Sequence, residues 1–104
     1  MFGSQTIEYV NSFYANHAIL GATGLTIDGP NDADADAGAV YRTMISRAAE
    51  TMVVADHSKF DRPALSIYGR WAEIRRLVSD EAPAGALGRA LERAHAEIVV
   101  SRHK

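Results

Sequence analysis

Four consecutive residues just past the middle of the chain place four different polar groups side by side. Asp56, His57, Ser58 and Lys59 supply a carboxylate, an imidazole, a hydroxyl and an ammonium group, and they directly follow the apolar run Thr51–Ala55. Lysine binds phosphate as a compact point charge, so a lysine in such a loop can meet a phosphorylated ligand. The same residues also fit a surface loop with an Asp–Lys ion pair, worth about 0–1 kcal/mol. Spacing alone leaves both interpretations open.

A glycine-containing segment, Gly21 to Gly24, follows an earlier apolar run. Glycine lets the backbone approach a ligand closely, and it also permits tight turns. The segment lacks the third glycine and the helix start of a dinucleotide-binding fingerprint. It therefore predicts either a turn or part of a phosphate-binding loop.

The acidic stretch from Asp32 to Gly38 has the alternating carboxylates of a calcium-binding loop but not its other residues. A calcium loop needs glycine at its sixth position and glutamate at its twelfth. Here the glycine comes at the seventh position and Thr43 occupies the twelfth. We interpret the carboxylates of Asp32, Asp34 and Asp36 as a cap on the following helix, where the helix dipole favours negative charge.

Several other kinds of site are not predicted. The chain has no cysteine, which excludes a disulfide, a zinc–thiolate site and a cysteine nucleophile. No two histidines have the i, i+4 spacing of a helical zinc site, and no serine lies in the nucleophile elbow of a hydrolase. We therefore expect no metal and no cofactor. The four histidines are His17, His57, His95 and His103.

The hydrophobic pattern alternates between helix and strand along the chain. Such alternation, with continuous apolar strands, is typical of a three-layer α/β fold with a mostly parallel sheet and helices on both faces. Ligands bind such sheets at the carboxyl ends of the strands, which places segments 21–31 and 56–60 on the functional edge. Strands are expected at 17–22, 51–55, 64–68, 74–78 and 97–100, helices at 4–16, 34–50 and 84–94, and loops at 23–32 and 56–63.

The length of 104 residues predicts a single domain with its own core. Hydrophobic residues make up 47% and charged residues 23% of the chain, which is typical of a globular protein and not of a disordered one. The net charge of −2 argues against direct nucleic-acid binding, which needs a basic patch. No apolar run reaches the ~18 residues of a membrane span and no signal peptide is recognisable, so we expect no membrane partner and a cytoplasmic location.

Five segments of the chain follow one another in a familiar order. They are HAILGATGLTIDG, VYRTMISRA, TMVVADHSKFDRPAL, IRRLVSDEAP and AEIVVS. Together they resemble the C-terminal effector domain of DeoR/GlpR-family bacterial transcription regulators, from about Phe2 to Ser101. The most specific segment is VVADHSKF, since the family typically has a strand, Ala-Asp, two small or polar residues and Lys-Phe here. The resemblance implies the C-terminal half of a fold similar to ribose-5-phosphate isomerase and glucosamine-6-phosphate deaminase.

The resemblance also implies roles for individual residues. Lys59 aligns with a lysine that contacts sugar phosphate in the deaminase-like enzymes, and Asp56 opens the same loop. The Gly21–Gly24 segment aligns with the loop that carries the catalytic aspartate of the deaminases, and Thr23 takes the place of that aspartate. Threonine cannot act as a carboxylate base, and Asp28 is nearby but not at the matching spacing. No catalytic residue is therefore expected. The expected ligand-binding residues are Gly21, Thr23, Gly24, Asp28, Asp56 and Lys59.

The function implied by the resemblance is non-catalytic binding of a phosphorylated sugar as an effector. Residues 1–104 are then a single, partial effector domain, and contact with DNA belongs to a helix-turn-helix domain absent from this chain. The alternative is a small sugar-phosphate isomerase or deaminase that uses Asp56, Asp28 or Asp80 as its acid–base group. If the early strands of the fold are missing, strand 17–22 becomes an uncovered sheet edge, which predicts a homo-oligomer.

Overall fold

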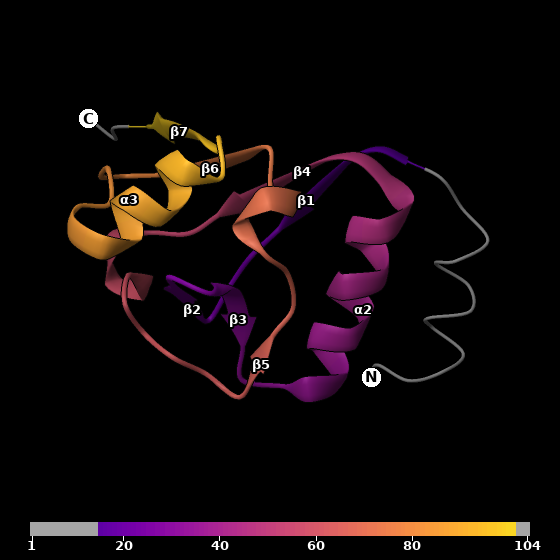
Figure 1. The fold of residues 1–104 in the computed structure, drawn as a ribbon. Coiled ribbons are helices and arrows are strands. Elements are labelled where there is room, and N and C mark those ends of the chain that lie inside the picture. The colour runs from indigo at the N-terminus through magenta and orange to yellow at the C-terminus, as the bar shows by residue number, and fades with distance from the viewer. Residues whose placement is uncertain (1–14, 102–104) are drawn as a thin grey trace.

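A computed structural model describes residues 15–101 of the chain. A four-stranded parallel sheet, in the order β1-β4-β6-β7, forms one layer (Figure 1). This confirms the predicted α/β class and the mostly parallel sheet. The predicted helix from Ser4 lies outside the described residues, except for Ala15 and Asn16, which belong to β1. The elements of this sheet and its helices are β1 (Ala15–Leu20), α2 (Ala35–Arg47), β4 (Ala48–Val54), β6 (Arg76–Ser79), α3 (Gly85–Arg93) and β7 (Glu97–Val100).

The core lies on one face of this sheet. Leu20, Val53 and Leu77 occupy matching positions on neighbouring strands, and each is almost fully buried. Side chains alternate between the two faces of a strand, so these residues point the same way. On the other face, Ile19 is 66% exposed and His17 is also exposed.

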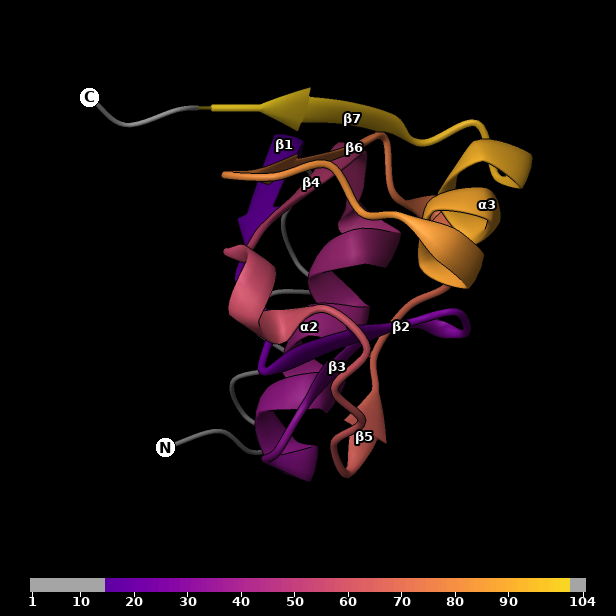
Figure 2. The ribbon, with the colours of Figure 1, turned by 90° about the vertical axis from the view of Figure 1, so that its left-hand side faces the viewer.

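Both described helices cover the same face of the sheet. Ile45 of α2 and Leu87 and Leu91 of α3 belong to the same hydrophobic cluster as the inward-facing strand residues. Figure 2 shows α2 and α3 on the same side of the parallel sheet, together with a second, smaller sheet. Within residues 15–101, the second helical layer expected for a three-layer arrangement is not found.

Segment 23–32 forms a β-hairpin, so its prediction as a loop was wrong. Strands β2 (Gly24–Thr26) and β3 (Gly29–Asp32) pair in antiparallel fashion, and β5 (Ser66–Ile67) adds a third strand on β3. Gly29 has a φ of 145°, and a Cβ there would lie 2.0 Å from the Gly69 carbonyl oxygen. The segment was predicted as a loop because its two strands are only three and four residues long and contain Gly24, Gly29 and Pro30, which are typical of turns. The strand expected at 64–68 is confirmed as the shorter β5, but it joins this small sheet.

Several element boundaries also differ from those predicted, and two of the differences have a clear structural cause. Helix α2 ends at Arg47 instead of Glu50, because residues 48 to 50 already pair with β1: Ala48 with Ala15 and Glu50 with His17. Tertiary strand pairing thus overrides the local helical pattern. Strand β6 starts two residues later than expected, after the short 3₁₀ helix η2 (Trp71–Glu73).

The capping role predicted for the acidic stretch is confirmed. The Oδ1 atom of Asp34 accepts hydrogen bonds from the backbone N–H groups of Asp36 and Ala37, at 2.9 and 3.5 Å. These donors are among the first N–H groups of α2, which have no partner within the helix. Within residues 15–101, no helix is long and apolar enough to cross a membrane.

Candidate functional site

Loops gather at the carboxyl ends of the parallel strands. One follows β1 and starts at Gly21, a second follows β4 and contains the 3₁₀ helix η1 (His57–Lys59), and a third follows β6 and starts at Asp80. Strands β1, β4 and β6 are neighbours in the sheet, so their carboxyl ends share one edge. Ligands of open parallel sheets bind at such an edge, which makes these loops the candidate site.

The loop after β4 is organised by Asp56. Its Oδ1 atom accepts hydrogen bonds from the backbone N–H of Ser58, at 2.8 Å, and from the Ser58 hydroxyl. These bonds from Ser58 hold the pKa of the Asp56 carboxyl below its usual range, so the carboxylate stays ionised. The Lys59 N–H donates to the Asp56 carbonyl at 3.1 Å, which closes the turn.

Lys59 forms no close ion pair with a carboxylate of the described residues. Within residues 15–101, no carboxylate oxygen lies within the 4.0 Å of an ion pair from its ammonium group. The close Asp–Lys ion pair considered from the sequence is therefore not found. Oδ1 of Asp56 accepts its hydrogen bonds from Ser58, and the charge of Lys59 only contributes, beyond ion-pair distance, to lowering the pKa of Asp56. The Lys59 side chain is half-buried.

The segment after β1 is fixed from two sides. The buried Tyr68 hydroxyl donates to the Gly21 carbonyl oxygen at 2.6 Å. The Thr23 N–H donates to the Asn31 carbonyl oxygen at 2.9 Å, and the Thr23 hydroxyl accepts from the Ala33 N–H at 3.3 Å. The segment is thus a hydrogen-bonded strand entry and not a free loop.

Gly24 lies where no larger residue fits. A Cβ at this position would lie 1.8 Å from the Arg62 carbonyl oxygen and 2.9 Å from Oδ1 of Asn31. The buried Asn31 amide donates to the same Arg62 carbonyl at 3.2 Å, while its Oδ1 has no partner among the described residues. Gly24 therefore permits a close packing of the chain segments on either side of the site.

The two predicted loops are joined directly. Leu25 and Phe60 form a parallel bridge, and the Asp61 N–H donates to the Leu25 carbonyl oxygen at 2.7 Å. Leu25 follows Gly24 and Phe60 follows Lys59 in the sequence. The structure thus brings together five of the six predicted residues, which are Gly21, Thr23, Gly24, Asp56 and Lys59.

Asp28 is the predicted residue that the structure does not bring to this edge. Gly24 pairs with Asn31 at the open end of the hairpin, and Thr26 pairs with Gly29 beside the turn. Asp28 lies in that turn, so it is at the opposite end of the hairpin from Gly24. Figure 2 shows the turn of the hairpin on the side of α3, away from η1.

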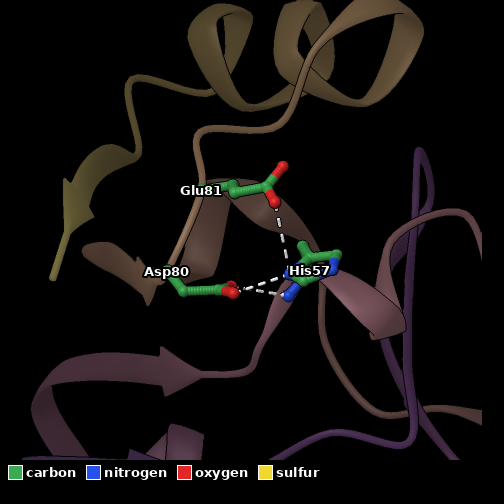
Figure 3. Close-up of side chains that lie close together, drawn as sticks. All are labelled: His57, Asp80 and Glu81. Carbon is green, nitrogen blue, oxygen red and sulfur yellow. Dashed lines mark hydrogen bonds and ion pairs between the residues drawn. The ribbon is translucent and has the colours of Figure 1, made fainter. Parts of the chain in front are cut away.

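A contact between the second and third loops was not predicted. Asp80 holds His57 through two atoms, with the His57 N–H 2.8 Å from Oδ1 and the His57 Nδ1 2.6 Å from Oδ2. Oε2 of Glu81 lies 3.4 Å from the same Nδ1 (Figure 3). The hydrogen bond to Asp80 raises the pKa of His57 and lowers the pKa of Asp80. The available signal was that His57 comes three residues after β4 and Asp80 directly after β6, since neighbouring parallel strands end at one edge.

Comparison with known families identifies the chain. The sequence profile of the DeoR C terminal sensor domain matches residues 1–81. The chain belongs to the DeoR family. This confirms the resemblance drawn from the five segments, and the matched DeoR region includes all three loops of the candidate site up to Glu81.

Named relatives of this DeoR-family chain are transcriptional repressors. The HTH-type transcriptional repressor GlcR of Bacillus subtilis is 32% identical over 97% of this chain. The glycerol-3-phosphate regulon repressor of Haemophilus influenzae is 31% identical over 82%, and the HTH-type transcriptional repressor CsqR of Escherichia coli is 28% identical over 96%. The matches cover only 39%, 34% and 39% of these relatives' own lengths.

Proposed function

We propose that this chain is a non-catalytic sensor domain that binds a phosphorylated sugar or polyol at the carboxyl edge of its parallel sheet. The observation that carries the proposal is the ammonium of Lys59, which makes no ion pair within residues 15–101, beside a carboxylate that accepts hydrogen bonds from Ser58. A lysine in this position provides a point charge for a phosphate group. Gly21, Thr23 and Gly24 then form the facing wall, with Asp56 setting the shape of the lysine loop.

The names of the relatives support a phosphorylated ligand. Glycerol-3-phosphate regulon repressors of Haemophilus influenzae and Escherichia coli match more than three quarters of this chain. Glycerol 3-phosphate joins a small polyhydroxyl carbon skeleton to a phosphate. A ligand of this class suits a site with one fixed cation and polar backbone groups around it.

The geometry favours binding over turnover. An isomerase or deaminase needs a carboxylate beside the sugar as its general base, and Thr23 stands where the resembling enzymes have aspartate. The Thr23 hydroxyl accepts a hydrogen bond from Ala33, and Asp28 lies at the far end of the hairpin. Asp56 is held by Ser58. We therefore propose no catalytic residue, and Asp28 is left out of the ligand site.

The remaining features of the proposal concern the larger assembly. We propose that residues 1–104 act as one partial effector domain in the cytoplasm, where a repressor meets both its effector and its DNA. Contact with DNA is assigned to a helix-turn-helix segment outside these residues, in line with the names of two relatives. Effector binding would then shift the populations of two arrangements of the whole regulator.

We also propose self-association through strand β1. Within residues 15–101 this strand lies at the edge of the parallel sheet, and its Ile19 is 66% exposed. Uncovered apolar edges invite pairing with another strand. Light scattering should report a dimer or larger species that Ile19→Lys reduces to a monomer, while Leu65→Lys, at a loop residue that is 76% exposed, leaves it intact. A wild-type monomer at high concentration would contradict this.

A ligand panel tests the proposed binding. Thermal unfolding is measured with glycerol 3-phosphate, ribose 5-phosphate and glucosamine 6-phosphate, and with the three compounds lacking phosphate. At least one phosphorylated compound should raise Tm, its partner without phosphate should not, and neither isomerisation nor ammonia release should be detectable. Turnover that Asp56→Asn abolishes would instead support the enzyme, and equal shifts with and without phosphate would exclude a phosphate site.

A further inference from the structure

Three side chains with metal-binding groups, one imidazole and two carboxylates, converge between the loops after β4 and β6. Figure 3 shows His57, from the loop after β4, facing Asp80 and Glu81, from the loop after β6. One ligand atom from each residue lies within 4.8 Å of the other two. The side chains are 54%, 41% and 61% exposed, so the space around them is open to solvent and to an incoming ion.

The charges of this cluster are unbalanced. Two carboxylates face one imidazole, and Asp56 lies close enough to act electrostatically on the same histidine. The described cation that acts on Asp56 is Lys59, which belongs to the proposed phosphate site. With a neutral imidazole, the three groups carry two negative charges, which a divalent cation would balance.

One of the carboxylates is already oriented. Oδ1 of Asp80 accepts hydrogen bonds from the His57 N–H, at 2.8 Å, and from the Ser79 hydroxyl, at 3.2 Å. These bonds leave Oδ2 directed at the His57 imidazole, 2.6 Å away. Hydrogen bonds that fix the second oxygen of a carboxylate are a common feature of metal sites, because they orient the ligand before the ion arrives.

We propose that His57, Asp80 and Glu81 form a binding site for a divalent transition-metal cation such as Zn²⁺ or Mn²⁺. An imidazole nitrogen with two carboxylate oxygens favours these ions over Mg²⁺, which prefers oxygen ligands. No metal site was predicted from the sequence, because no two histidines have the i, i+4 spacing of a helical zinc site. That spacing does not detect ligands that come from two different loops.

The distances are close to those the ion requires. Zinc bonds of about 2.0–2.2 Å place neighbouring ligand atoms roughly 3–3.5 Å apart in a tetrahedral site. The separation of 3.4 Å between Nδ1 of His57 and Oε2 of Glu81 already fits. The Nδ1–Oδ2 pair at 2.6 Å opens when the ion replaces the hydrogen bond between them. Three protein ligands leave at least one position for water or for an oxygen of a bound ligand.

Calorimetric titration of the full 104-residue chain with ZnCl₂, MnCl₂ and MgCl₂ tests the site without any sugar phosphate, so it does not depend on the proposed function. We expect one Zn²⁺ per chain, removal by EDTA, and weaker binding of Mg²⁺. His57→Asn, Asp80→Asn and Glu81→Gln should each weaken Zn²⁺ binding by at least about tenfold.

Matched control variants show whether the ion binds at the proposed cluster or at other exposed His and Glu side chains. His95→Asn and Glu92→Gln remove the same kinds of group from an exposed position at the end of α3 and should leave binding unchanged. Glu81→Gln keeps both Asp80–His57 hydrogen bonds, so its fold should be retained, as circular dichroism would verify. Absence of saturable binding by the wild type would overturn the site, and so would tight binding that survives in His57→Asn and Glu81→Gln.

Discussion

Leu25 and Phe60 form a parallel bridge between two segments that are 35 residues apart in the sequence. The bridge is reinforced by the hydrogen bond from the Asp61 N–H to the Leu25 carbonyl oxygen, at 2.7 Å. Each bridging residue directly follows a proposed ligand residue, Gly24 in one segment and Lys59 in the other. The small sheet therefore has a function in the proposed site: it holds the loop after β1 against the loop after β4.

Gly24→Ala should destabilise the chain because its Cβ would collide with the Arg62 carbonyl oxygen, which lies 1.8 Å from the Cβ position. Forcing extra atoms into a closely packed region costs about 1–3 kcal/mol. Urea unfolding gives the free-energy change. Gly21→Ala is the control, since nothing lies within 4 Å of its Cβ, and its stability should stay unchanged or rise by up to about 1 kcal/mol. Equal stability of the two variants would contradict the close packing at Gly24.

Tyr68→Phe should lower the free energy of unfolding by about 1 kcal/mol, because it removes the hydrogen bond to the Gly21 carbonyl oxygen. Burial raises the pKa of the Tyr68 hydroxyl, so this group remains a donor at neutral pH. The ring and its edge-on contact with Tyr41 are retained in the variant. Urea unfolding at pH 7 makes the measurement, and a variant as stable as the wild type would show that this bond does not fix the loop after β1.

Glu73 should make stability depend on acidic pH. One of its oxygens accepts from Arg42, at 2.7 Å, and from the Arg70 N–H, at 3.0 Å. Partial burial opposes ionisation, but the hydrogen bonds from Arg70 and Arg42 and their charges lower the pKa of Glu73 on balance. Because the folded pKa is the lower one, the carboxylate stabilises the fold above the ordinary glutamate pKa of about 4.3, and this stabilisation is lost as pH falls through the folded pKa.

The difference in Tm between the wild type and Glu73→Gln should therefore be clear at pH 7 and vanish in strong acid. Thermal unfolding followed by circular dichroism across this pH range measures it. Glu92→Gln is the control, since within residues 15–101 the Glu92 side chain makes no ion pair. A Tm difference for Glu73→Gln that is the same at every pH would contradict the assigned role of its charge.

The parallel sheet and the loops at its carboxyl ends could be predicted because their signals are local. Runs such as Thr51–Ala55 are apolar and rich in β-branched residues, and polar residues follow them directly. The hairpin at 23–32 could not be predicted in this way, since its two short strands carry glycine and proline in place of an apolar run, and the strand that completes its sheet, Ser66–Ile67, joins from far along the chain. The start of β4 at Ala48 was missed for the same reason, because its partner in β1 overrides the helical pattern.

In the candidate site, too, the features with a local sequence signal could be predicted, and those that depend on contacts in the folded chain could not. Asp56 and Lys59 stand out in the sequence because four polar groups follow one strand. That Asp56 accepts hydrogen bonds from Ser58, and that Lys59 makes no ion pair among the described residues, depends on side-chain geometry that spacing does not determine. The pairing of His57 with Asp80 depends on β4 and β6 being neighbours in the sheet.

Calorimetric titration of Lys59→Met tests the proposed contact between the Lys59 ammonium and the phosphate of the effector. The titrant is the phosphorylated compound that raises Tm of the wild type most. Loss of one charged hydrogen bond costs about 1.5–3 kcal/mol, so affinity should fall about ten- to hundredfold, while Arg89→Met, which removes an exposed cation from α3, should bind like the wild type. Wild-type affinity in Lys59→Met would contradict a contact between Lys59 and the phosphate.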